Sequence, residues 1–180
     1  VMFSPRGYLF AACSQGSLDG LVRRANTMRL NGIRAEILTR EEVMKEAPYL
    51  DYTEQARFPI YGGMLQPDAG TARHDAVAWG YARAADQLGV DIIQNCEVIG
   101  VQREGDQVVG IETTRGVIKS KKIGVVAAGH SSVIADMAGI RLPLESHPLQ
   151  ALVSEPMKPI LHTVVMSNAI HAYASQSDKG

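Results

Sequence analysis

The chain has 180 residues, of which 46% are hydrophobic and 21% charged, a composition typical of soluble globular proteins. Its 18 basic and 19 acidic side chains give a net charge of -1, so no overall field attracts nucleic acid or anionic lipid. No apolar run approaches the ~20 residues that span a bilayer, and the first residues lack the pattern of a secretion signal. We therefore expect a cytoplasmic protein of about one domain's length that binds neither nucleic acid nor membrane.

Thiol, metal and hydrolase chemistry find little support in the sequence. Cys13 and Cys96 lie far apart and form no CxxC motif, so we expect buried free thiols and neither a zinc site nor a redox dithiol. His147, His162 and His171 show no metal-ligand spacing and are interpreted as structural. No Ser/His/Asp arrangement indicates a hydrolase.

Apolar periodicity divides the chain into strands and helices. Strands are predicted at residues 3–12 (or a hairpin there), 56–61, 90–93 with 98–101, 108–113, 117–119, 123–128, 150–154 and 163–166. Helices are predicted from residue 17 to Gly32, from residue 40 to Pro48, from residue 75 to Gly89, and over residues 131–138. Thr39 and Glu42 fit a capping box. Turns at Gly105-Asp106 and Arg115-Gly116 predict a three-stranded meander, and the apolar run 123–128 is typical of a strand buried on both faces.

A glycine-rich stretch, Gly62-Gly63-Met64-Leu65-Gln66-Pro67-Asp68-Ala69-Gly70-Thr71, precedes the clearest predicted helix. A flat ring system can pack against main chain only where side chains are missing, and Gly62, Gly63 and Gly70 permit that approach. A plain turn explains the same glycines without any ligand. The residues alone favour the turn.

His74 is expected in the first turn of that helix, where the macrodipole disfavours an imidazolium. An uncharged imidazole at pH 7 keeps a lone pair for nucleophilic attack, and Arg73 can stabilise negative charge on an electron-accepting ring. A capping or surface histidine is the simpler interpretation from spacing alone. Further along, His130 follows Ala128-Gly129 at a strand-to-helix junction, where N–H groups can bind phosphate or ribose oxygens.

Together these segments resemble a known family over nearly the whole chain. Gly-Gly-Met-Leu-Gln-Pro-Asp-Ala-Gly at residues 62–70, Asn95-Cys96-Glu97-Val98, the meander and Val-Val-Ala-Ala-Gly at residues 125–129 resemble the middle of the FAD-dependent amino-acid and sarcosine oxidase superfamily. Within it, Arg73-His74-Asp75-Ala76-Val77-Ala78-Trp79-Gly80-Tyr81-Ala82-Arg83 resembles the beta subunits of heterotetrameric sarcosine oxidases, as does the stretch from Met28 to Ile33.

The resemblance implies two flavins, a noncovalent FAD and an FMN attached covalently to a histidine. His74 matches the FMN-bearing histidine and Arg73 its basic neighbour, and Gly62-Gly63 is then expected near the flavin. Val98 is expected to contact the adenine side of FAD through its main chain, and Ala128-Gly129 to lie near the ribose or pyrophosphate. For His74, the resemblance reverses the preference for a capping role.

The resemblance also implies a chemistry and a set of partners. Sarcosine or a similar secondary amine would transfer a hydride to FAD, electrons would pass to the covalent FMN, and oxygen would reoxidise it. The imine's one-carbon unit would pass to tetrahydrofolate, leaving glycine. Other subunits of a hetero-oligomeric oxidase are the implied partners, and the catalytic residues of the substrate site are expected outside this chain.

One family feature is missing: no G-x-G-x-x-G fingerprint holds the FAD pyrophosphate. We therefore expect an internal fragment that binds FAD weakly or not at all. The predicted fold is mixed α and β, in which part of a Rossmann-like FAD domain with its meander (residues 62–142) interleaves with an antiparallel-sheet substrate domain (residues 1–61 and 143–180).

Two other functions remain open. One is a single-flavin amine or amino-acid dehydrogenase in which His74 merely caps the helix. The other is a catalytically silent module that associates through its surfaces, and exposed strand edges would then favour a homo-oligomer.

Overall fold

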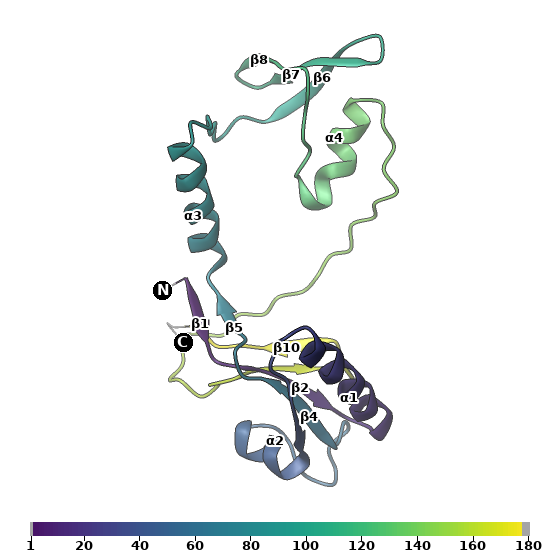
Figure 1. The fold of residues 1–180 in the computed structure, drawn as a ribbon, viewed down its shortest axis with the longest axis vertical. Helices are drawn as coiled ribbons and strands as arrows, with labels where there is room; N and C mark the ends of the chain where they lie inside the picture. Colours follow the sequence, from purple (N-terminus) through teal and green to yellow (C-terminus); the bar gives the residue numbers. More distant parts are fainter. Residues whose placement is uncertain (1, 178–180) are drawn as a thin grey trace. The chain divides into compact units, whose positions relative to one another are not determined.

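The computed structural model describes residues 2–177 and divides into two compact units. One unit, called unit 1, joins the residues up to Arg83 with those from Val153 onward, and unit 2 is Ala84–Leu152. The predicted mixture of α and β structure is confirmed (Figure 1). The predicted boundaries at residues 61/62 and 142/143 differ from those of the two units, and the assignment of substrate and FAD domains stays a prediction.

Unit 1 is built on a five-stranded sheet in the order β10-β9-β2-β4-β3. Its strands are β2 Tyr8–Ala12, β3 Glu36–Thr39, β4 Gly62–Gln66, β9 Val164–Ser167 and β10 Ala172–Ala174. The central strand β2 pairs antiparallel with β4 and parallel with β9. The other pairs in this sheet are antiparallel. Segments more than 150 residues apart in the sequence, such as Tyr8 and Val164, therefore lie side by side.

The predicted strand or hairpin at residues 3–12 is a chain that bends between two sheets. β1, Phe3–Pro5, pairs with β5, Gly70–Ala72, whereas β2 pairs with β4 and β9. Between them Gly7 has a φ of 74°, a conformation that glycine adopts without steric cost. The hairpin alternative is wrong, because β1 and β2 do not pair with each other.

Two helices cover opposite faces of the sheet. In α1, Gln15–Leu30, Leu21 packs in a cluster with Phe10, and in α2, Arg40–Glu46, Val43 packs in a cluster with Leu9. Successive side chains of a strand point to opposite faces, so the neighbours Leu9 and Phe10 place the two helices on different sides (Figure 1).

The predicted helix starts and stops depend on local hydrogen bonds. At α2 the capping box is confirmed, with Glu42 N–H donating to Thr39 Oγ1 at 3.2 Å and Thr39 N–H donating to the Glu42 carboxylate at 2.8 Å. α1 begins two residues before the predicted Ser17, because the Ser14 hydroxyl accepts a hydrogen bond from the Ser17 main chain. α3, His74–Gln87, begins one residue before the prediction, and none of its side chains is buried.

Unit 2 contains the predicted meander, which is confirmed. Its strands are β6 Val98–Glu104, β7 Gln107–Thr113 and β8 Gly116–Lys119, paired antiparallel in sequence order. The short helix α4, Ser131–Met137, follows the 3-10 turn Ala128–His130 and packs against β6. Arg103 Nη1 in β6 donates to the Ala138 carbonyl at 2.9 Å and fixes the end of the helix.

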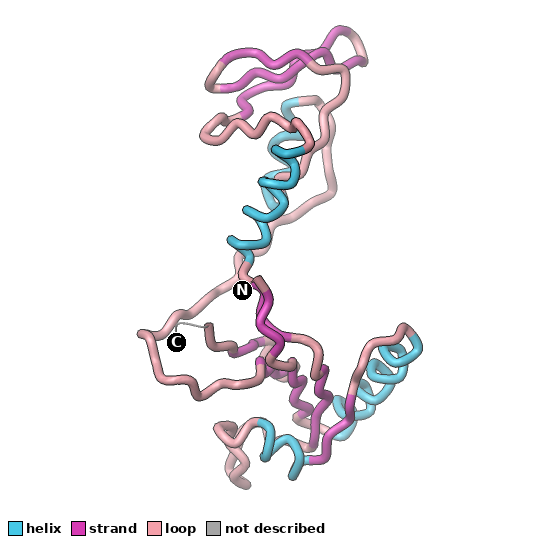
Figure 2. The backbone as a smooth tube through the Cα atoms, turned by 60° about the vertical axis from the view of Figure 1, so that its left-hand side comes forward, coloured by secondary structure: helices cyan, strands magenta, loops and turns pink. Residues whose placement is uncertain are grey.

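Four predicted strands are wrong. Residues 56–61, 90–93, 123–128 and 150–154 form no strand, and most of them are drawn as loop in Figure 2. A strand needs a neighbour to accept and donate its main-chain hydrogen bonds, and these runs have none among the described residues. Val126 is 98% exposed, and Leu152 is 99% exposed. In contrast, Ile60 is buried in the cluster that contains Leu9, so this one side chain of residues 56–61 serves packing, whereas Phe58 and Tyr61 are exposed.

The two cysteines are free, as predicted, but both are only partly buried. Gly62 and Gly63 lie inside β4 and are buried. A Cβ at Gly63 would lie 2.8 Å from the Phe10 carbonyl oxygen and 3.0 Å from Val43 Cγ2. The plain-turn interpretation is therefore wrong for Gly62-Gly63, where the close approach occurs within a strand.

We expect Gly63→Ala to lower the stability of the chain by about 1–3 kcal/mol, because overpacking forces the strand away from β2 and α2. The matched control is Gly20→Ala in α1, where the nearest atom to a new Cβ is Arg23 Nη2 at 3.9 Å. Alanine there should be neutral or stabilising by up to ~1 kcal/mol. Thermal unfolding followed by circular dichroism measures both, and equal melting temperatures for the two variants would contradict the packing argument.

Candidate functional site

The candidate site lies where β5, paired with β1, leads into α3. β5 pairs with β1, so that Ala72 lies opposite Phe3, and the next N–H, that of Arg73, donates to the Met2 carbonyl at 2.9 Å. The Arg73 carbonyl then accepts from Val77 N–H at 3.0 Å, which opens the helix. His74 therefore follows directly on a hydrogen-bonded main chain.

The His74 side chain is exposed at the first position of α3. Within residues 2–177 the structure gives no hydrogen bond to its imidazole, so no such bond competes for either ring nitrogen. This placement agrees with the predicted position in the first turn and leaves the side chain outside the apolar clusters. Its uncharged state stays a prediction.

Arg73 reaches across His74 to Asp75. Arg73 Nη2 lies 2.9 Å from Asp75 Oδ2, and the two side chains are about half-exposed. The hydrogen bond from Arg73 lowers the pKa of the Asp75 carboxyl, and a hydrogen bond from the Ala76 main chain lowers it further. Sequence reasoning identified Arg73 but missed Asp75, although an acidic residue in a first helical turn is a recognisable signal.

A buried hydroxyl lies in the strand that leads to α3. Thr71 Oγ1 in β5 is buried, and within residues 2–177 the structure shows no hydrogen-bond partner for it. Leaving a buried polar group unpaired costs about 1–3 kcal/mol. The segment from Thr71 to Asp75 therefore combines one unsatisfied hydroxyl, one ion pair and one accessible imidazole.

The other predicted flavin-proximal residues, Gly62-Gly63, occupy the middle of the sheet. The space that a Cβ would take is already filled by atoms of Leu38, Leu18, Phe10 and Val43. The fold itself therefore explains why these positions are glycine. Their nearness to a flavin stays a prediction.

The residues predicted to contact FAD belong to unit 2. Val98 begins β6, an edge strand whose outer side has no partner strand among residues 2–177. Ala128 and Gly129 are exposed, Ala128 has a φ of 46°, and the Gly129 carbonyl accepts a hydrogen bond from Ser146 Oγ at 2.8 Å. Because α4 follows this turn and packs against β6, unit 2 holds both segments in one body.

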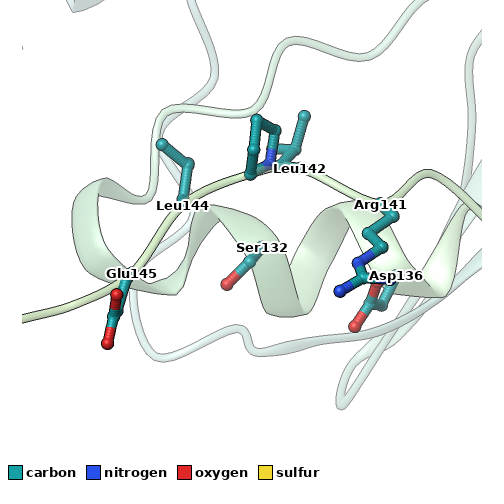
Figure 3. Close-up of a pocket in the computed structure, with 7 residues that line it drawn as sticks. Ser132, Asp136, Arg141, Leu142, Leu144 and Glu145 are labelled. Atoms are coloured by element: carbon teal, nitrogen blue, oxygen red, sulfur yellow. The ribbon is translucent and has the colours of Figure 1, made fainter.

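Unit 2 also has an open surface hollow of about 560 Å³. Figure 3 shows Ser132 and Asp136 projecting from α4, with Arg141 and Glu145 on the segment that runs past the helix. Leu142, Pro143 and Leu144 complete the lining. No spacing in the sequence indicated this hollow, because its residues meet only when the segment after α4 folds back.

Other kinds of site are not found among the described residues. In residues 2–177 no group of three or more His, Cys, Asp or Glu side chains could hold a metal ion. No helix in this range is long and apolar enough to cross a membrane.

Comparison with known proteins identifies the chain's relatives. The family model "FAD dependent oxidoreductase" matches residues 1–180. The chain belongs to the FAD dependent oxidoreductase family. It is similar to "Sarcosine oxidase subunit beta" of Rhizobium meliloti (strain 1021), with 57% identity over 99% of this chain and 43% of that protein. The same-named protein of an Arthrobacter species is 50% identical over 99% of this chain and 44% of its own length.

The family fold is also found among solved structures. The crystal structure of L-proline dehydrogenase from P. horikoshii matches with a TM-score of 0.80 and 24% identity, over 99% of this chain and 47% of that one. The resemblance to sarcosine oxidase beta subunits is thus confirmed, as is the mixed fold. This family member spans less than half the length of these two curated relatives.

The positions of Val98 and Ala128-Gly129 are compatible with their predicted contacts to FAD. Val98 lies at an open strand edge, and the turn at Ala128-Gly129 is exposed, although the Ser146 side chain already contacts the Gly129 carbonyl. A φ of 46° at Ala128 is uncommon for a residue with a side chain and is typical of functional turns.

We expect Arg73→Gln to raise the pKa of the Asp75 carboxyl toward its ordinary value, because the guanidinium hydrogen bond is its largest cause of lowering. Since the pKa is lowered in the folded chain, the pair's contribution to stability is present above the ordinary carboxyl range and is lost as the pH falls through the folded-state pKa. A carboxyl-carbon NMR titration measures the change. An unchanged Asp75 titration in the variant would show that the pair does not form.

Proposed function

We propose that this chain forms part of a flavin-dependent oxidoreductase that oxidises sarcosine or a similar secondary amine, and that His74 carries a flavin covalently. Similarity to sarcosine oxidase beta subunits over 99% of the chain supports the reaction class. The observation that carries the attachment is the exposed imidazole at the start of α3, with no competing hydrogen bond among residues 2–177.

The residues of unit 1 and those of unit 2 have separate roles in this proposal. Val98 and the turn at Ala128-Gly129 hold the adenine and ribose ends of FAD through main-chain groups. When bound, a flavin would supply the hydride acceptor for amine oxidation and a route for electrons to oxygen. Arg73 places a guanidinium, paired with the Asp75 carboxylate, beside the point of attachment. The protein acts in the cytoplasm with the other subunits of a hetero-oligomeric oxidase.

Covalent attachment would form a carbon–nitrogen bond between an imidazole nitrogen and a methyl carbon of the flavin ring system, with loss of the imidazole N–H proton and of one methyl proton. The electron pair of the broken C–H bond would reduce the ring, and the oxygen used in the proposed oxidase reaction would reoxidise it. The nitrogen must be deprotonated and accessible, and it must be held on a rigid element so that the bonded ring keeps one orientation. The bent ladder of β1 with β5 meets the second requirement, because its last hydrogen bond, from Arg73 to Met2, immediately precedes His74.

A second proposal concerns the 180 residues by themselves. Apolar side chains such as Val126, Leu149 and Leu152 are almost fully exposed, and large exposed apolar surfaces favour association. We expect the isolated chain to be catalytically silent, to bind FAD weakly and to self-associate. Turnover of sarcosine by the isolated chain would overturn this expectation.

The covalent bond is tested on the protein made from the longest reading frame that contains this chain. Trypsin should release a peptide ending at Arg83 whose mass includes FMN, and the yellow colour should stay with the denatured polypeptide. In His74→Ala the flavin-bearing peptide and the covalent colour should both disappear, because the bonding nitrogen is gone.

His130→Ala serves as the matched control, since His130 is a second exposed histidine at the start of a helix. It should keep the covalent flavin. Release of all flavin from the unmodified protein by denaturation would contradict attachment at His74 and would favour a single-flavin dehydrogenase in which this histidine caps α3.

A further inference from the structure

We infer that Asp75 is an electrostatic positioning residue for the flavin site: its carboxylate holds the Arg73 guanidinium beside His74 and balances its charge, so that the ion pair sets the reduction potential of the attached flavin. This inference rests on the proposed attachment at His74. It assigns a function to a residue that neither the sequence patterns nor the comparisons single out.

The geometry of the first turn carries the inference. The two charged residues flank His74 on either side in the sequence, and their side chains meet at 2.9 Å between Arg73 Nη2 and Asp75 Oδ2. Arg73 is fixed at its main chain by the Met2 carbonyl and by Val77 N–H. Arg73 is therefore held by hydrogen bonds of its main chain and by the contact of its guanidinium with the Asp75 carboxylate, on the residues that flank His74.

The electrostatics follow from the charge that reduction creates. A reduced flavin carries more negative charge than an oxidised one, so a nearby uncompensated cation stabilises it, and a nearby anion destabilises it. An ion pair presents nearly zero net charge to a group outside it. Removing either partner should therefore shift the potential, and the two single removals should shift it in opposite directions.

A structural role alone would give a different pattern. Exposed ion pairs contribute little to stability because water screens them, and both side chains here are about half-exposed. Loss of the pair should leave the fold intact. A change in flavin potential with unchanged melting temperature thus separates charge balance from a general loosening of α3.

The experiment compares single and double substitutions of the two charged residues in the protein made from the longest reading frame that contains this chain. The potential is measured for the flavin that His74→Ala removes. Asp75→Asn should shift it to a more positive value, Arg73→Gln should shift it to a more negative value, and the double variant should return close to the unmodified protein. Asp75→Glu should also stay close to the unmodified value, because it keeps the charge.

Ionic strength and a second ion pair provide the controls. The single-variant shifts should shrink as salt is raised, because exposed charges are screened within about 8 Å at physiological ionic strength. Asp68→Asn breaks another exposed ion pair, in which Arg34 Nη1 lies 2.9 Å from Asp68 Oδ1. That variant should leave the flavin potential unchanged.

The outcomes distinguish this inference from the proposed function. Absence of flavin from the His74 peptide of the unmodified protein overturns the attachment and, with it, the inference. A covalent flavin whose potential is the same in Asp75→Asn and the unmodified protein overturns only the inference. Shifts in the same direction for Asp75→Asn and Arg73→Gln, or an equal shift in Asp68→Asn, also overturn it.

Discussion

The hydrogen bonding of β2 to two strands from distant parts of the chain is the constraint on which unit 1 depends. β2 pairs antiparallel with β4 on one side and parallel with β9 on the other. Through these two pairings a segment near residue 165 and a segment near residue 64 share one sheet with the first residues of the chain. Leu9 and Met64, both fully buried, belong to strands of this arrangement.

The strands of this sheet continue toward the candidate site through a bend. β2 pairs with β4 and β1 pairs with β5 in two successive antiparallel pairings. Their registers differ by one residue, because residues 6 and 7 oppose residues 67–69 between them. Both Arg6 N–H and Gly7 N–H donate to the Ala69 carbonyl there, at 3.1 and 2.8 Å. An irregularity of this kind bends a strand and redirects the residues beyond the bend. The start of α3 is thus set by main-chain bonds.

Local sequence signals predicted local structure well. The capping box at Thr39 and Glu42 works through hydrogen bonds within one turn, and the meander depends on short turns between consecutive strands. Such interactions depend on nearby residues only. The run 123–128 failed as a strand for the opposite reason, since an apolar run cannot specify which distant strand will pair with it.

For Gly62, Gly63 and His74 too, the sequence predicted the local feature but not the distant contacts or the significance. Sequence reasoning recognised that Gly62 and Gly63 permit close approach, but it could not say that Phe10 and Val43 of the same chain would fill the space. The position of His74 at a helix start was predictable from the helical pattern, and its significance came from the family resemblance. Asp75 was missed because its role depends on which way the Arg73 side chain turns.

The charges around His74 call for an explanation other than stability. Two opposite charges held at 2.9 Å on an exposed first turn add little to folding, since water screens both. In β5, just before this turn, Thr71 keeps a buried hydroxyl without a partner among the described residues, which is unfavourable for folding. Features that stability does not explain cluster at functional sites. Under the proposed attachment at His74, the ion pair would act on the bonded group through its field, while its contribution to folding stays small.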